Sequence, residues 1–141
     1  MPEYAPHGNY EISLHPDHDR VIWVAASGSI NIEMLRHHNN LTNEIVEGFR
    51  GRPYGMVCDF DDGMLMTPEA EDAWVKSAID RVARGWTCVA YHFDCRADHK
   101  LLVRHQVSRV FDSIGVHWIE AVDESTALTW VLAQLAEADR N

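Results

Sequence analysis

The sequence predicts a small α/β domain in which a mostly parallel β-sheet begins with an N-terminal β-hairpin. Strand-like apolar runs alternate with helix-like amphipathic stretches over most of the chain, and such alternation is typical of parallel strands joined by right-handed helical crossovers. The first two strand-like runs follow each other across a short turn, which is typical of a hairpin. The chain has 141 residues, enough for one domain with a single core.

The predicted hairpin combines two strands of different character. Residues 10–15 (YEISLH) alternate between polar and apolar, whereas residues 20–27 (RVIWVAAS) are more continuously apolar and therefore more buried. Pro16 and the polar residues that follow it form the turn. Residues 1–9 contain two prolines and a glycine without periodicity, so we expect a flexible arm followed by one domain over 10–141.

The first helix is predicted over about residues 32–49, with Asn31 as its N-cap. Its expected apolar stripe consists of Met34, His38, Leu41, Ile45 and Phe49. The short apolar run over 54–60 is the third strand. Because it is apolar throughout, it is typical of a buried parallel strand.

A second helix starts at Thr67 and Pro68, since a capping hydroxyl followed by proline is a strong helix-start signal. Its expected core stripe is Val75, Ile79 and Val82. The fourth strand covers 86–93.

The remaining pattern predicts one more strand between two helices. A valine-rich stripe predicts the third helix, and residues 116–121 form the last strand. Asp123 caps the last helix, so the predicted order is ββαβαβαβα. The two stripes are Val103, Val107, Val110 and Ile114, then Leu128, Val131, Leu132 and Leu135.

Charge and cysteine content exclude several classes of function. The formal net charge is -10, which argues against nucleic acid or an anionic membrane surface as the main partner. No apolar stretch is long enough for a transmembrane segment, and no signal-peptide pattern is visible at the start. The three cysteines include no CxxC pair, which favours free thiols and a cytoplasmic location.

Three short runs together resemble the STAS superfamily in its SpoIIAA-like branch, relatives of bacterial anti-sigma-factor antagonists. They are Val57-Cys58-Asp59-Phe60-Asp61-Asp62, Thr67-Pro68-Glu69-Ala70 and Ala127-Leu128-Thr129-Trp130. The resemblance covers about residues 10–137 and implies a SpoIIAA-like fold. In STAS proteins a serine of an Asp-Ser-Ser-Gly run is phosphorylated to control partner binding. This chain lacks that run and has Pro68 near the serine position.

The acidic residues after the third strand are the first candidate site. Asp59, Asp61, Asp62 and Thr67 lie in or beside a loop at the carboxyl end of a parallel strand, where α/β sheets commonly bind ligands. We predict a ligand or partner loop here. The alternative is a hydrated turn whose acids favour the start of the next helix, with Thr67 as a cap rather than a phosphorylation switch.

A basic ridge around the third helix is the second candidate. Arg96, Lys100 and Arg104 are spaced by four residues, and Arg109 lies further along the same helix. This ridge predicts a docking face for an acidic partner or for a second copy of the chain, and a two-fold homodimer is expected on that basis. The alternative is a solvated face balanced by acids elsewhere.

No motif for catalysis, a metal or a cofactor is visible. The sequence has no GxSxG elbow and no glycine-rich nucleotide fingerprint. His92, Asp94, Cys95 and His99 lie close in sequence, but a second Cys/His pair at zinc-site spacing is missing. We therefore predict no catalytic residues, no metal and no cofactor.

Function is predicted only in outline. A non-enzymatic regulatory or protein-interaction module of the STAS-like type is the leading hypothesis. The alternative is a carrier that holds a small apolar or anionic ligand between the sheet and a mobile helix. The five tryptophans favour either a well-filled core or an apolar pocket.

Overall fold

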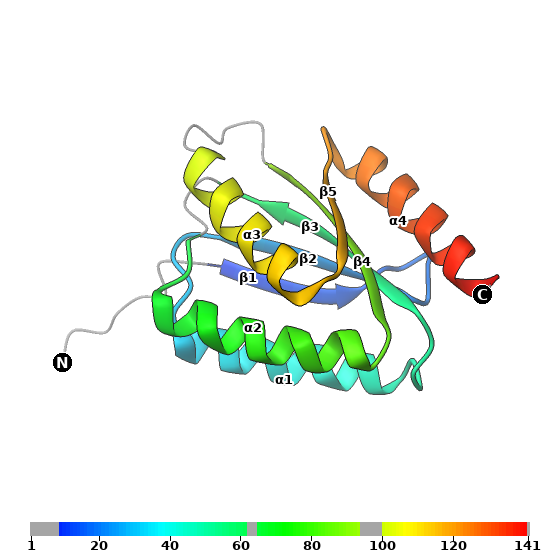
Figure 1. Ribbon diagram of the computed structural model, residues 1–141, viewed down its shortest axis with the longest axis horizontal. Helices are drawn as coiled ribbons and strands as arrows, with labels where there is room; N and C mark the ends of the chain where they lie inside the picture. Colours follow the sequence, from blue (N-terminus) through cyan, green and yellow to red (C-terminus); the bar gives the residue numbers. More distant parts are fainter. Residues whose placement is uncertain (1–8, 62–64, 94–99, 141) are drawn as a thin grey trace.

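The computed structural model describes residues 9–61, 65–93 and 100–140, which form a five-stranded sheet with four helices (Figure 1). The element order confirms the predicted ββαβαβαβα. The strands are β1 (Asn9–Leu14), β2 (Val21–Ser27), β3 (Tyr54–Phe60), β4 (Trp86–Phe93) and β5 (His117–Glu120). The helices are α1 (Ile32–Glu47), α2 (Pro68–Ala83), α3 (Lys100–Ile114) and α4 (Glu124–Asp139).

The strands lie in the sheet in chain order, β1-β2-β3-β4-β5. Only β1 is antiparallel to its neighbour, as the predicted hairpin requires, and the other pairings are parallel. Three successive right-handed crossovers that step in one direction place their helices on one face of a sheet. Accordingly α1, α2 and α3 share one hydrophobic core with that face, while α4 covers the other (Figure 1).

The smaller core, under α4, is tightly packed. Val131 and Leu135 of α4 meet Val57 and Cys88 of the central strands there. A Cβ atom at Gly55 would lie 2.5 Å from Val131 Cγ1 and 2.9 Å from Cys88 Sγ, so only glycine fits beneath the helix. Helix α4 is therefore locked against β3.

The larger core lies under three helices, and the predicted stripes of α1 and α2 are confirmed in part. His38 and Phe49 are buried, and Met34, Ile45, Val75 and Val82 pack partly buried against this core. The prediction was wrong at Leu41, which is exposed, and at Ile79, which is more than half exposed.

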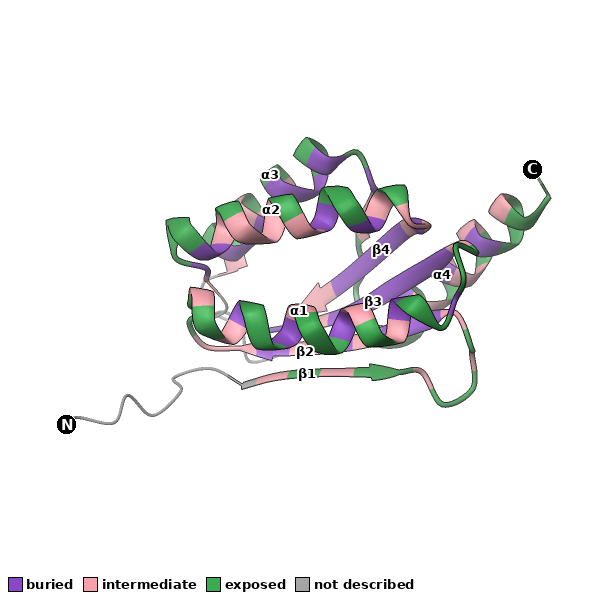
Figure 2. Ribbon diagram, turned by 90° about the horizontal axis from the view of Figure 1, so that it is seen from below, coloured by how far each residue is buried: buried purple, intermediate pink, exposed green. Residues whose placement is uncertain are grey.

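The inward faces of these two helices also include residues outside the predicted stripes. Helix α1 buries Leu35, Thr42 and Val46, and helix α2 buries Ala70, Ala78 and Arg81. Figure 2 shows the exposed residues along the outer sides of the two helices. Thr42 and Arg81 were missed because they are polar.

The other local predictions agree better with the structure. The stripe Val103, Val107, Val110 and Ile114 of α3 is buried as expected. In α4, Val131 and Leu135 are buried, while Leu128 and Leu132 are partly buried against the same core. Asn31, Thr67 and Asp123 all cap their helices. The predicted arm lies mostly outside the described residues, and β1 begins at Asn9.

None of the helices in the described ranges is long and apolar enough to cross a membrane.

Candidate functional site

Two acids of the predicted acidic loop contact other residues of the chain. Asp59 lies in β3, with its Oδ1 atom 3.8 Å from Nδ1 of His92 on the neighbouring strand. Asp61 follows β3 and accepts a hydrogen bond from the backbone N–H of Gly28 at 3.2 Å. Asp62 lies outside the described residues. The carboxylate of Asp61 therefore fastens the loop after β2 to the loop after β3.

Main-chain bonds close these two loops further. Ile30 donates to the carbonyl of Leu65 at 2.8 Å and accepts from the N–H of Thr67 at 3.2 Å. The Thr67 hydroxyl accepts from the N–H of Ala70 at 3.2 Å, which is the bond of a helix cap. Thr67 thus has a structural role at the start of α2.

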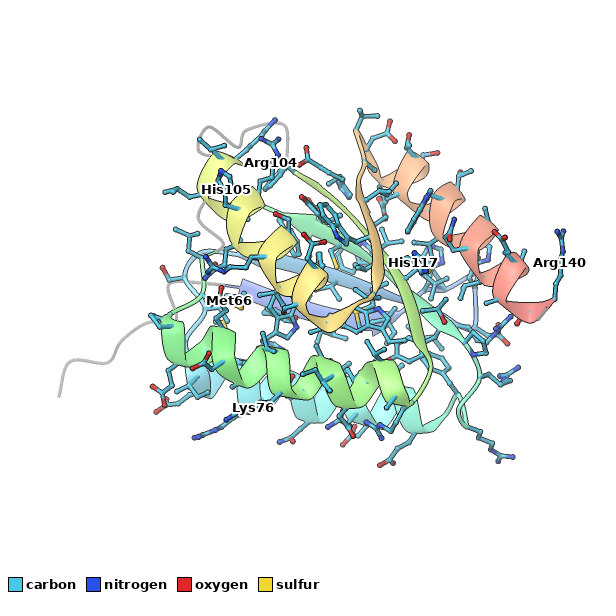
Figure 3. The ribbon with its side chains drawn as sticks, in the orientation of Figure 1. Met66, Lys76, Arg104, His105, His117 and Arg140 are labelled. Carbon is cyan, nitrogen blue, oxygen red and sulfur yellow. The ribbon has the colours of Figure 1, made fainter. Side chains whose placement is uncertain are left out.

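The loop before α2 is also held from the side by α3. The side-chain amide of Gln106 both accepts from the N–H of Met66 at 2.8 Å and donates to its carbonyl at 2.9 Å. Met66 lies between α2 and α3 in Figure 3. In addition, the order of the parallel strands never reverses, so the sheet has no topological switch point at which a crevice would open.

Two arginines of the predicted docking face form ion pairs within the chain. Arg104, which projects from the first half of α3 (Figure 3), donates to Glu120 of β5 at 2.9 Å. Its guanidinium holds the pKa of Glu120 below the usual value for a glutamate. Arg109 pairs with Glu71 of α2. These two arginines link α3 to β5 and α2. Their ion pairs agree with the alternative interpretation of the ridge, a face whose charge is balanced by acids elsewhere in the chain.

The first turn of α3 remains more open. The Nζ atom of Lys100 lies 6.0 Å from the centre of the Phe93 ring. Leu101 and Leu102 are 60% and 62% exposed. Arg96 lies outside the described residues, so the ridge is seen only in part.

The Cys/His cluster near β4 is also only partly described. His92 is placed in β4, whereas Asp94, Cys95 and His99 lie outside the described residues. Over the described ranges, no group of three or more His, Cys, Asp or Glu side chains is arranged to hold a metal ion.

An apolar cavity of about 30 Å³ lies between the sheet and the layer of α1, α2 and α3. A space of this size holds one or two water molecules. Both layers contribute large apolar side chains to its wall. They include Ile12, Val24 and Met56 from the sheet and Trp74, Trp86 and Phe111 around the helices and strand ends.

Among the described residues, Arg81 of α2 is the one charged side chain in the wall of this cavity. It is 3% exposed. Its Nη2 atom donates to the side-chain carbonyl of Asn39 on α1 at 2.6 Å, and its Nε atom has no hydrogen-bond partner among the described residues. No carboxylate of the described ranges forms an ion pair with it. Burial lowers the pKa of the guanidinium from its ordinary value, although an arginine stays charged at neutral pH.

Further buried polar groups surround Arg81. The phenols of Tyr10 and Tyr54 interact electrostatically with it, and burial raises the pKa of both. The Tyr54 hydroxyl has no hydrogen-bond partner within the described structure. The Tyr10 ring stacks on His38 at 3.9 Å between ring centres. Burial lowers the pKa of His38 to about 4, so this imidazole is neutral at pH 7.

The inward face of α2 explains why space remains beneath it. Ala70, Trp74, Ala78 and Arg81 follow one another at spacings of four, four and three residues, so they share one face of the helix. Ala70 and Ala78 are fully buried, and their side chains fill less space than large apolar side chains would. The same spacing is present in the sequence, but a pattern of large apolar residues does not reveal it, because two of its four members are alanines and one is an arginine.

Polar side chains join α2 to α1 where the two helices lie side by side (Figures 1 and 2). Asn39 donates to the Ser77 hydroxyl at 2.8 Å, and Arg84 donates to the side chain of Asn43 at 3.1 Å. With the bond from Arg81 to Asn39, these contacts form a polar seam, defined by Asn39, Asn43, Ser77, Arg81 and Arg84.

Comparison with known proteins identifies the fold. A crystal structure of an uncharacterised protein of the DUF3478 family from Shewanella loihica PV-4, described as having a SpoIIAA-like fold, superimposes with a TM-score of 0.60 at 15% sequence identity. The match covers 88% of this chain and 93% of that chain. The fold is SpoIIAA-like. No protein-family model and no curated protein matches the sequence. The SpoIIAA-like fold expected from the three sequence runs is therefore confirmed, and at this identity the likeness concerns the fold alone.

Proposed function

We propose that this chain binds a small, largely apolar ligand between the sheet and the layer of α1, α2 and α3. The observation that carries the proposal is the apolar cavity, whose wall contains a buried, unneutralised arginine. Ligand sites are commonly apolar spaces with a few converging polar groups. The Nε atom of Arg81 has no hydrogen-bond partner in the described structure, and a buried polar atom of this kind is costly unless something binds it.

A ligand larger than one or two waters requires the helix layer to move outward. Helix α2 is the element that can move, because the side chains that it buries completely are those of two alanines and Arg81, while its large apolar side chains, such as Trp74, are only partly buried. Its seam with α1 consists of hydrogen bonds that water can replace. By contrast, α4 is interlocked with β3 at Gly55. The cavity is therefore expected to open by separation of α2 from α1, because their contact is mainly polar and its loss exposes little apolar surface to water.

Mass spectrometry of the protein purified from cells tests the proposal. Native spectra should show an added mass that disappears under denaturing conditions. Val24→Phe, which fills the cavity, should lose this mass. Val21→Phe is the matched control, because Val21 is equally buried in the same strand but faces α4. The proposal fails if no added mass is seen and no apolar compound raises the melting temperature of the wild type more than that of Val24→Phe.

A regulatory or protein-interaction role is the second candidate function, and one observation favours it. Leu101 and Leu102 stand exposed beside Lys100 at the start of α3, and exposed apolar pairs beside a charge are common in protein interfaces. Sedimentation velocity at tens of micromolar tests self-association through this patch. A dimer that Leu101→Glu dissociates supports this role, whereas a monomer at low and moderate salt contradicts the expected homodimer.

A further inference from the structure

We propose that the ligand is a small monocarboxylic acid with an apolar body, and that Arg81 binds its carboxylate while the body fills the cavity. This inference rests on the proposed function and specifies the chemical class of the ligand. Two observations support it: Arg81 is buried without an acid partner in the described structure, and the side chains around it in the cavity wall are mostly apolar.

Four arginines that are at least partly exposed pair with acids, whereas the buried arginine has no acid partner in the described structure. Arg20, Arg84, Arg104 and Arg109 each have a carboxylate within 4.0 Å, and their side chains are between 18% and 66% exposed. Arg81 is 3% exposed, and its one side-chain acceptor in the described structure is the neutral amide of Asn39. Because an unpaired charge is far more costly in the interior than at the surface, charge pairing is missing where it matters most.

A carboxylate is the anion that fits this position. The two oxygens of a carboxylate match the planar fork of a guanidinium, and the Nε–H of Arg81 has no other acceptor among the described residues. One negative charge neutralises the one positive charge of Arg81. A phosphate dianion would instead leave an excess negative charge in an apolar wall.

The rest of the ligand must be apolar, because the remainder of the cavity offers little else. Trp74 and Phe111 pack edge to face at 5.5 Å between ring centres on the side of α2 and α3. Met56 and Val24 line the floor. An acid whose carboxylate reaches Arg81 would therefore place an aliphatic or aromatic body among these side chains.

Isothermal titration calorimetry with two matched probes tests this assignment. Octanoate carries the carboxylate, and octan-1-ol carries the same chain without the charge. The wild type should bind octanoate at least tenfold more tightly than octan-1-ol. Arg81→Met should lose that preference, binding octan-1-ol as the wild type does and octanoate at least tenfold more weakly than the wild type. Unchanged binding of octan-1-ol shows that the variant is folded and that its cavity is intact.

The outcomes separate the two proposals. If Arg81→Met binds octanoate as tightly as the wild type, the carboxylate assignment is wrong while a binding cavity remains. If neither probe binds the wild type, or if Val24→Phe binds both as well as the wild type does, the proposed function itself is wrong. Should Arg81→Met not fold, the wild type alone decides. Equal affinity for octanoate, octan-1-ol and octylamine would overturn the assignment, and a clear preference for octanoate would support it.

Discussion

Arg81→Met should leave the ligand-free protein about as stable as the wild type. Replacing a buried residue normally destabilises a protein. Here the replaced group is a charge that is 3% exposed and has no acid partner in the described structure. Methionine has a similar unbranched stem and a flexible thioether, so it can occupy the same space without a charge.

The magnitude follows from two opposing contributions. Loss of the bond from Arg81 to Asn39 costs about 1.5–3 kcal/mol, the range for a hydrogen bond with a charged donor. Asn39 keeps its bond to Ser77, which reduces that cost. Removal of buried charge gains about 1–4 kcal/mol when well-packed apolar groups replace an ion pair, and an unpaired charge is at least as unfavourable. The two ranges nearly cancel, so the expected net change in the free energy of unfolding is close to zero and within about 2 kcal/mol in either direction.

Urea unfolding followed by tryptophan fluorescence measures this change on protein refolded from denaturant, which removes bound ligand. Arg104→Met is the comparison, because it breaks an exposed ion pair with Glu120 and should cost about 0–1 kcal/mol. In saturating octanoate the wild type should be more stable than Arg81→Met, because the ligand binds the folded wild type more tightly and therefore stabilises it more. A loss of more than about 2 kcal/mol in ligand-free Arg81→Met would refute the reasoning, because Arg81 would then stabilise the fold without a ligand.

Three further predictions concern the fold. Gly55→Ala should cost roughly 1–3 kcal/mol of unfolding free energy by overpacking against Val131, and in the double variant with Val131→Ala the losses should be less than additive; additive losses in urea unfolding would mean that the two sites do not touch. Burial holds the pKa of His38 at about 4, against about 6.5 in the unfolded chain. Protons therefore bind preferentially to the unfolded state between these values, and stability should fall by roughly 1–2 kcal/mol, after allowance for solvent screening, as the pH drops from 6.5 to 4. His38→Phe should remove that part of the pH dependence, and an unchanged profile would count against it. Thr67→Ala should cost about 1 kcal/mol through loss of the bond to Ala70, while Thr67→Asp keeps the cap; equal stabilities of the two variants would argue against a capping role.

Sequence patterns were sufficient for the fold because the strands and α3 follow simple rules. The strands at 54–60 and 86–93 are continuous apolar runs and begin and end where predicted. In α3 every buried position is apolar, so its valine stripe marks the inward face directly. The hairpin and the three helix caps also depend on local residues alone.

The inward faces of α1 and α2 could be predicted only in part. A search for apolar periodicity assumes that apolar residues point inward, so it missed Thr42 and Arg81, which these helices turn toward the core. The acidic loop and the basic ridge could be predicted from the sequence as clusters of charge, but their ion pairs could not. The pairing of each acid with a base depends on tertiary contacts such as that of Arg104 with Glu120, which lie 16 residues apart. The buried arginine was missed for the same reason, because the groups around it come from α1 and from the strands β1 and β3.

The most direct test of the central claim is the response of the tryptophan indoles to octanoate in a ¹H–¹⁵N NMR titration. Trp74 and Trp86 line the cavity, whereas Trp23 and Trp130 pack on the opposite face of the sheet, with α4. A ligand that enters between the sheet and α2 should shift the signals of the first pair in a saturable manner and leave those of the second pair in place. Saturable shifts at Trp74 and Trp86, with none at Trp23 and Trp130, are the result that we expect. No saturable shift, or equal shifts at all four indoles, would contradict ligand binding in this cavity.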